Sequence, residues 1–325
     1  MKPFEFVWFA FFILFIASTT AHADEPMWET RGMPYAIFET LPVTHVNVGG
    51  ATLDIAFTPG NFDLPKTTIV NWIAARARMV ADYYGHFPVK KLQLLIISTE
   101  GNGIPHGTSY GYGGGAIKLA LGRHVTQARL DNDWVLVHEM VHLAFPSQVP
   151  AHLWIEEGIA TYVEPIARTQ AGQMNVTEVW RQLVDGIHKG LPNPGDEGLD
   201  NTHTWGRTYW GGALFCLLAD IEIRRRTNNK YGLRDALRAV TDAGGSIEEK
   251  WPLEEILKIG DGAVGVPVLS ELYQSMKAMP VETDLTSLWH KLGVAIKNGD
   301  VIFDDSAPLA AVRRGITAAS LPDQR

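Results

Sequence analysis

The sequence predicts an α+β fold, in which the strands come early in the chain and the helices come late. Two observations support this class. Alternating apolar and polar residues occupy 36–57, and 91–98 (KLQLLIIS) forms a buried apolar run. Beyond about residue 131, apolar residues recur at helical spacing behind good capping residues. A chain of 325 residues is long enough to bury a substantial core, as one large domain or as two lobes around a cleft.

The early elements follow from local patterns. Gly49 and Gly50 interrupt the alternation of 36–57, which predicts a hairpin-like pair of strands. Residues 66–84 carry apolar residues at helical spacing behind Pro65 and are expected to form a helix. A glycine-dense loop at 101–115 separates the strand at 91–98 from a short strand at 116–121.

The later elements are mostly helical. Asp131, Asn132 and Asp133 are good capping residues, and Pro146 ends the apolar segment that follows them. The expected helices cover about 134–145, 152–167 and 208–226, and the remainder of the chain to residue 319 is expected to be mostly helical.

The first 23 residues have the three parts of a secretory signal. Lys2 supplies positive charge, residues 6–17 are apolar, and Ala21-His22-Ala23 is an A-x-A cleavage site. A retained membrane anchor is the alternative, but the apolar run is short for one. We expect an exported protein, in a bacterial periplasm, with no stable membrane insertion after signal cleavage.

The charge and the cysteine content exclude a class of partner and a source of stability. The net charge is -8 and no basic stripe stands out, so a nucleic-acid partner is not expected. Cys216 is the only cysteine, so the chain has no internal disulfide and its stability must come from packing.

The segment His138-Glu139-Met140-Val141-His142 carries the chemistry. Histidines at i and i+4 lie on one face of a helix, so both rings can reach a single ion. Zinc binds imidazole nitrogens at about 2.0–2.1 Å, and a catalytic site keeps one position for water. Glu139 is rotated part of a turn away, where its carboxylate can act as the general base. The alternative is an ordinary buried helix with two hydrogen-bonded histidines.

A catalytic zinc site needs a third protein ligand. The next predicted helix offers the adjacent carboxylates Glu156 and Glu157. Neighbours on a helix point about 100° apart, so only one of the two can face the metal. Residue patterns alone leave both glutamates as candidates for the third ligand.

A family resemblance selects between them. HEMVH followed by LWIEEGIATYVE resembles the gluzincin metallopeptidases of the aminopeptidase N type, whose second helix reads W-x-x-E-G-x-A-x-Y. Aligned on Trp154 and Gly158, this pattern implies that Glu157 is the third ligand. Residues 143–156 separate it from His142, a shorter connection than the family's usual one.

Two further segments extend the resemblance. RTYWGGALF (207–215) resembles the Y-x-K-G-A-L segment, with a continuation similar to glycyl aminopeptidases, and implies that Tyr209 donates a hydrogen bond to the oxyanion. Gly113, Gly114 and Gly115 stand where the family has a substrate-pairing strand with a G-G/A-x-E motif. The amine-binding glutamate of that motif is missing, which leaves an endopeptidase or another exopeptidase specificity open.

The resemblance covers residues 66–226 and implies a zincin-like (thermolysin-like, peptidase MA-like) catalytic domain, with a β-rich upper lobe and an α-helical lower lobe. Residues 24–65 would form an N-terminal β-rich segment and 227–325 a C-terminal helical region. The expected protein is an exported zinc metallopeptidase with one zinc ion, a zinc-activated water, Glu139 as general base and a peptide or protein substrate. The alternatives are a zinc hydrolase of a non-peptide amide or ester and a non-catalytic peptide-binding zinc module. The sequence leaves the oligomeric state open.

Overall fold

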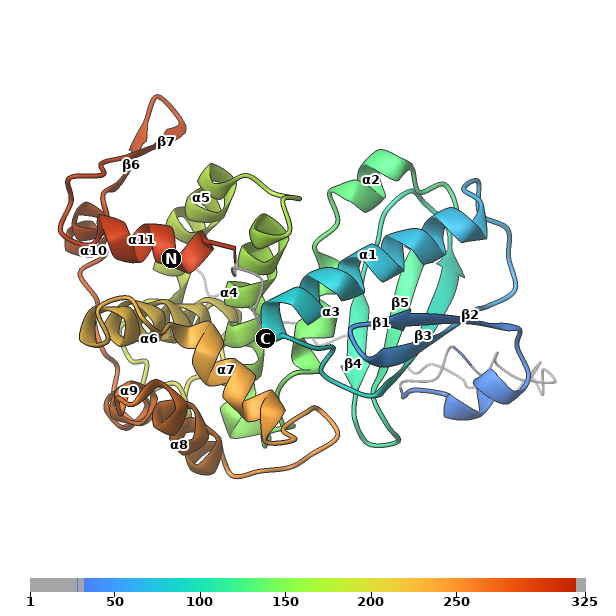
Figure 1. Cartoon of the computed structure of the whole chain (residues 1–325), viewed down its shortest axis with the longest axis horizontal. Helices are drawn as coiled ribbons and strands as arrows, with labels where there is room; N and C mark the ends of the chain where they lie inside the picture. The colour runs from blue at the N-terminus through green and yellow to red at the C-terminus, as the bar shows by residue number, and fades with distance from the viewer. Residues whose placement is uncertain (1–27, 29–31, 320–325) are drawn as a thin grey trace, which may run out of the picture.

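A computed structural model describes residues 28 and 32–319 of the chain. The predicted signal peptide, residues 1–23, lies outside the described residues. Within the described part of the chain, no helix combines the length and the apolar character needed to cross a bilayer. Figure 1 shows a sheet with helix α1 in one half of the molecule and a group of helices in the other, with α3 and α4 between them.

A mixed five-stranded sheet has the order β1-β2-β3-β5-β4. The hairpin of β1 and β2 is antiparallel and turns at Gly49 and Gly50, whose φ angles of 56° and 83° suit a primed turn. Strand β3 runs parallel to both β2 and β5, and β4 pairs antiparallel with β5 at the edge. The strands are β1 (Val43–Val48), β2 (Ala51–Phe57), β3 (Lys91–Thr99), β4 (Gly107–Tyr110) and β5 (Ala116–Gly122).

The two faces of the sheet are covered differently. Leu92, Leu94 and Ile96 on β3 pack into the main core with the apolar face of α1, whereas Leu95 points the other way. Leu95 packs in a small cluster under the N-terminal 3₁₀-helix Tyr35–Glu39. Successive side chains of a strand alternate between the two faces of the sheet. Because β3 is apolar on both faces, it needs α1 on one face and the 3₁₀-helix on the other.

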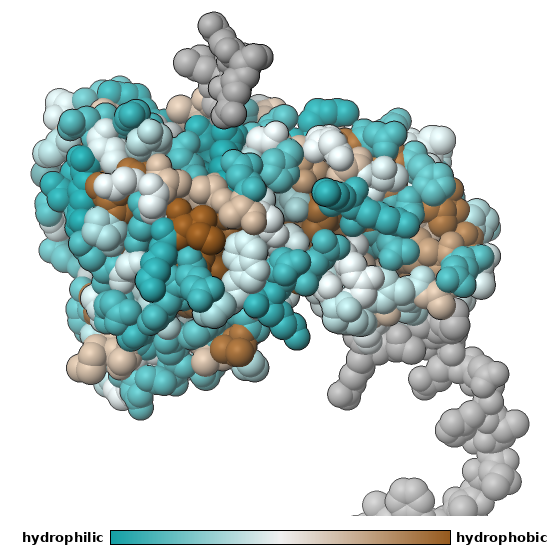
Figure 2. Space-filling model, turned by 60° about the horizontal axis from the view of Figure 1, so that its bottom comes forward, coloured by the Kyte–Doolittle hydropathy of each residue, from teal (hydrophilic) through white to brown (hydrophobic). Residues whose placement is uncertain are grey.

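In the described part of the chain the remaining elements are helical except for one hairpin, which projects from the helical half (Figure 1). The helices are α1 (Lys66–Tyr84), α2 (Gln127–Asp131), α3 (Val135–His142), α4 (Leu153–Gln170), α5 (Val176–Ile187), α6 (Gly212–Arg226), α7 (Leu233–Asp242), α8 (Leu253–Val264), α9 (Val268–Met276), α10 (Leu285–Leu292) and α11 (Ala310–Thr317); the hairpin is β6 (Val294–Lys297) with β7 (Asp300–Phe303). Figure 2 shows a largely hydrophilic face with small, separate hydrophobic patches.

The early strands, the helix at 66–84 and the later helices are confirmed, with four differences. The stretch expected to begin a strand at 36 forms the 3₁₀-helix Tyr35–Glu39 before β1. The glycine loop at 101–115 contains the edge strand β4, and the mostly helical C-terminal region includes the hairpin β6–β7. The expected helix 208–226 is π-helical over Gly206–Gly211 before α6.

Candidate metal centre

Helix α3 carries the first two candidate ligands. Its N-terminus is capped by Asp133, whose carboxylate accepts from Leu136 N at 3.0 Å. One helical turn separates His138 and His142, and their ring centroids lie 4.9 Å apart. The helix is short and almost entirely buried, so its register against the sheet is fixed by packing.

Glu157 on α4 completes the group. Its Oε2 lies 3.2 Å from His138 Nε2 and 3.5 Å from His142 Nε2. One possible donor atom from each residue lies within 4.8 Å of the other two. The side chains are only 8%, 13% and 15% exposed, in the order His138, His142, Glu157. Two imidazoles and a carboxylate are a donor set that catalytic zinc uses.

The electrostatics of the group follow from this closeness. Burial raises the pKa of Glu157, but hydrogen bonds and charge interactions with the two histidines outweigh it and hold the pKa at about 2. Burial lowers the pKa of His142, yet the hydrogen bond and charge of Glu157 raise it to about 9. The carboxylate is therefore ionised, and a cation is favoured beside it.

The neighbouring Glu156 lies elsewhere. Its carboxylate accepts from Gln148 N at 2.8 Å and so holds the turn between α3 and α4. The two adjacent glutamates thus have different partners, and the structure brings Glu157, not Glu156, to the histidines.

Two glycines set the crossing of α4 and α6. A Cβ added to Gly158 would lie 2.3 Å from Gly212 C, and one added to Gly212 would lie 2.0 Å from Trp154 O. Backbone therefore packs on backbone at this point, which no larger residue allows. Because Gly158 follows Glu157 and Gly212 lies just beyond Tyr209, this contact brings both functional side chains to the same place.

Tyr209 lies on the π-helical segment Gly206–Gly211 that leads into α6. Its ring is near-parallel to that of His138, with centroids 6.4 Å apart, and stacks on Trp205 at 5.9 Å. Burial first, then the charges of Glu157 and Glu139 and a hydrogen bond with Glu157, raise the pKa of Tyr209 to about 12. The phenol therefore keeps its proton at neutral pH. Single π turns in helices are frequent at functional sites.

Glu139 lies on the side of α3 that faces β4. Ser109 Oγ lies 2.7 Å from Glu139 Oε2, to which it can donate, and also 2.7 Å from the Glu139 carbonyl oxygen. A Cβ at Gly107 would come within 2.6 Å of Glu139 Cγ, so the glutamate side chain needs this glycine. Gly107 and Ser109 are two residues apart and therefore share one face of β4. Together they fix the position of the Glu139 carboxylate.

A cavity of 590 Å³ lies over the metal-ligand group. Strand β4, Gly111 and Tyr112 line it, together with His138, Glu139, His142, Glu157 and Tyr209.

The predicted substrate glycines come next in the chain and have other contacts. Tyr35 Oη donates to Gly114 O at 2.8 Å, and Gly115 N donates to Glu248 Oε1 at 2.7 Å. A Cβ on Gly113 would meet the Tyr35 ring at 2.7 Å. The edge of the sheet belongs to β4, and these glycines form the connection from β4 to β5.

Sequence reasoning missed Gly107 and Ser109, because they lie in a glycine-rich stretch read as a loop. Thr108 and Tyr110, which favour strands and lie between Pro105 and Gly111, were the available signal.

The fold is similar to that of a solved aminopeptidase N family protein. An aminopeptidase N family protein from Idiomarina loihiensis superposes with a TM-score of 0.58 at 13% identity, over 79% of this chain and 50% of that protein. An M1 zinc metallopeptidase from Deinococcus radiodurans gives a TM-score of 0.48 at 14% identity, over 74% of this chain and 52% of that protein. This chain thus spans about half the length of each. No protein-family model matches the sequence, and no curated protein matches it. The predicted resemblance to the aminopeptidase N family is confirmed for the fold.

Proposed function

We propose that this chain is a zinc-dependent peptidase in which His138, His142 and Glu157 hold one zinc ion. The convergence of these three donor atoms within 4.8 Å, in a buried position, carries the proposal. The match in fold to an aminopeptidase N family protein supports it. A zinc ion bound there would activate water and polarise the carbonyl of the bond to be cut.

Glu139 is the proposed general base. It takes a proton from the attacking water and passes it to the departing amine, so that water and amide become carboxylic acid and amine. Ser109 and Gly107 hold its carboxylate beside the ligands, so the base is oriented before substrate arrives. A purely structural zinc site has no use for such a base, which favours an enzyme over a non-catalytic module.

Tyr209 is the proposed donor to the oxyanion. Its phenol lies beside His138 and keeps its proton, because its pKa is raised to about 12. A donor aimed at the position where negative charge develops stabilises the transition state more than the ground state.

Strand β4 is the proposed template for substrate. It is one of the two outer strands of the described five-stranded sheet and lines the cavity over the ligands, so an extended peptide can pair with its outer edge. In this proposal β4 takes the role that the sequence assigned to Gly113, Gly114 and Gly115. The sheet and the helical half then act as the two lobes of a zincin-like domain, with the ligands between them.

Export to a bacterial periplasm remains part of the proposal and rests on the signal-like residues 1–23. Cell fractionation with N-terminal sequencing of the mature protein tests it. A mature chain that begins after Ala23 in the periplasmic fraction is the expected result.

The test of function is metal-dependent hydrolysis of unstructured polypeptides. The zinc-loaded protein should cleave, a chelator should stop cleavage, and added zinc should restore it. Glu139→Gln should lower kcat/KM at least about a hundredfold while keeping one zinc per chain. Retained activity in this variant would contradict the proposed mechanism.

Metal content tests the ligand assignment separately. Glu157→Gln should lose zinc, whereas Glu156→Gln, the matched change one residue away, should keep it. Equal zinc content in the two variants contradicts Glu157 as a ligand.

A further inference from the structure

The ligand group lies where two cavities meet. The cavity of 590 Å³ beneath β4 lies on one side, and a second, larger cavity of 890 Å³ extends between α4 and α5 on the other. His138 and Tyr209 line both cavities. A carbonyl group placed at the ligands therefore has space for chain on both of its sides.

The floor of the larger cavity continues from the third ligand. Thr161, Glu164 and Arg168 line it and follow Glu157 on α4 at steps of four, three and four residues, which is one helix face. Arg168 Nη1 donates to Glu164 Oε1 at 2.6 Å, and both side chains are nearly buried. The pair therefore gives the cavity a polar, hydrogen-bonded floor.

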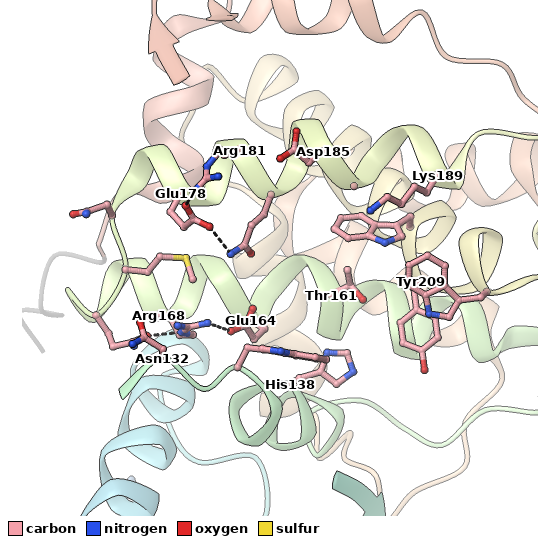
Figure 3. Close-up of a pocket in the computed structure, with 18 residues that line it drawn as sticks. Asn132, His138, Thr161, Glu164, Arg168, Glu178, Arg181, Asp185, Lys189 and Tyr209 are labelled. Atoms are coloured by element: carbon pink, nitrogen blue, oxygen red, sulfur yellow. Dashed lines mark hydrogen bonds and ion pairs between the residues drawn. The ribbon is translucent and has the colours of Figure 1, made fainter. Parts of the chain in front are cut away.

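Helix α5 forms the opposite wall. Glu178, Gln182 and Asp185 of α5 line the cavity at one-turn spacing, and Lys189 of the following 3₁₀-helix His188–Gly190 continues the row. The other face of α5 carries its buried residues. Figure 3 shows Glu178 and Lys189 on this wall and Thr161 on α4. Gln182 Nε2 donates to Glu178 Oε1 at 3.1 Å. Both walls thus offer polar groups at regular intervals, which suits the repeated amides of a peptide backbone.

Two exposed tryptophans line the cavity beside the ligands. Trp134 is 53% exposed and packs edge-on against His138 at 5.5 Å, and Trp205 is 61% exposed and stacks on Tyr209. Tryptophan is enriched at binding hot spots because it buries a large area on contact. Each ring contacts a residue that lines both cavities, His138 for Trp134 and Tyr209 for Trp205.

We propose that the substrate is a polypeptide cleaved at an internal bond, with one stretch under β4 and the other in the cavity between α4 and α5. This inference rests on the proposed function and names its substrate class. A cavity of 890 Å³ is near the upper end of the roughly 300–1,000 Å³ that hold one small ligand. Because a second cavity of 590 Å³ adjoins it, the site accommodates more than a single amino acid on each side.

The first experiment measures cleavage of two peptides that share the bond cut. One is short with a free N-terminus, and the other is long with both ends blocked. The long peptide should be cleaved with a kcat/KM at least about tenfold higher. Cleavage restricted to free N-termini, or independent of length, overturns the inference while leaving the proposed function intact.

The second experiment tests the cavity by obstructing it. Gln182→Trp should fill the space between α4 and α5, and Gln274→Trp makes the same change on the exposed face of α9. Each is combined with Glu139→Gln, and binding of the long blocked peptide to the zinc-loaded protein is measured by fluorescence anisotropy. The obstructing variant should bind at least about tenfold more weakly, whereas the control should bind as the single variant does. Asp185→Trp repeats the test if circular dichroism shows that Gln182→Trp does not fold.

The two proposals fail in different ways. Unchanged binding in the obstructing variants, with normal cleavage of short peptides by the wild type, overturns only the cavity assignment. Binding that the obstructing variants abolish, with no cleavage of any peptide by the wild type, supports the cavity and overturns the proposed function.

Discussion

The two sides of the metal-ligand group are held in place by different means. On one side, the single helix α3 of 8 residues carries His138, Glu139 and His142, and helical spacing alone fixes their relative directions. On the other side, Glu157 and Tyr209 come from separate helical segments, which pack backbone on backbone where Gly158 meets Gly212. The relative directions of the side chains on the first side are therefore encoded locally, whereas those on the second side depend on tertiary packing between helices.

Removing the hydroxyl of Tyr209, on the second side of the metal-ligand group, should have the largest effect on turnover. Tyr209→Phe should lower kcat roughly 10²–10³-fold, the loss typical of one oxyanion donor, with zinc content unchanged. Steady-state kinetics and metal analysis measure the two quantities. Tyr231→Phe is the matched control. A decrease below about threefold contradicts the assigned role.

Disturbing the helix crossing should have the next largest effect. The methyl group of Gly212→Ala would meet Trp154 O, so α4 and α6 must separate and displace both Glu157 and Tyr209. We expect kcat to fall by about a hundredfold and the free energy of unfolding to fall by roughly 1–3 kcal/mol, measured by chemical denaturation.

Gly262→Ala on α8 is the control for that change, because a Cβ there meets nothing within 4 Å. It should stabilise the protein by up to about 1 kcal/mol. Equal effects of the two substitutions would show that the crossing does not position the site.

Loosening the position of Glu139, on the first side of the metal-ligand group, should have a smaller effect on kcat. Ser109→Ala removes the hydroxyl that holds the Glu139 carboxylate, and we expect kcat to fall about tenfold with KM unchanged. Ser109→Thr should recover part of the loss, since it restores a hydroxyl. Ser275→Ala removes a hydroxyl from an exposed helix and serves as the control. A change in KM alone would assign Ser109 to substrate binding instead.

The smallest expected effect concerns stability. Burial raises the pKa of Glu164 to about 7 against the opposing influence of Arg168, so the folded protein binds more protons than the unfolded chain between pH 4.5 and 7. Stability from this residue is present at low pH and is lost as pH rises through that interval. Glu164→Gln should flatten this decline in thermal melts from pH 5 to 8. A decline as steep as in the wild type contradicts the raised pKa.

The same division explains what could be predicted from the sequence. Residues 66–84 and the HEMVH helix follow from local spacing, and the structure places both as expected. Strand β4 was missed because four residues within a glycine-rich stretch carry little alternation, and because its pairing with β5 is set by the sheet. Residue patterns alone offered Glu156 and Glu157 equally, and the family resemblance implied Glu157. In the structure the two glutamates have separate tertiary partners.

The π-helical segment Gly206–Gly211 makes the direction of Tyr209 depend on the length of the chain as well as on residue type. A π turn accommodates about one residue more than an α turn at the same rise, so deleting one residue there would restore regular α-helix. The helix on either side of the segment would keep its direction, and the change would fall on the side chains of the π-helical segment itself, including Tyr209. A frame-preserving loss of the codon for Trp210 would thus shift the phenol relative to the ligands while every ligand and the proposed general base remained in the sequence.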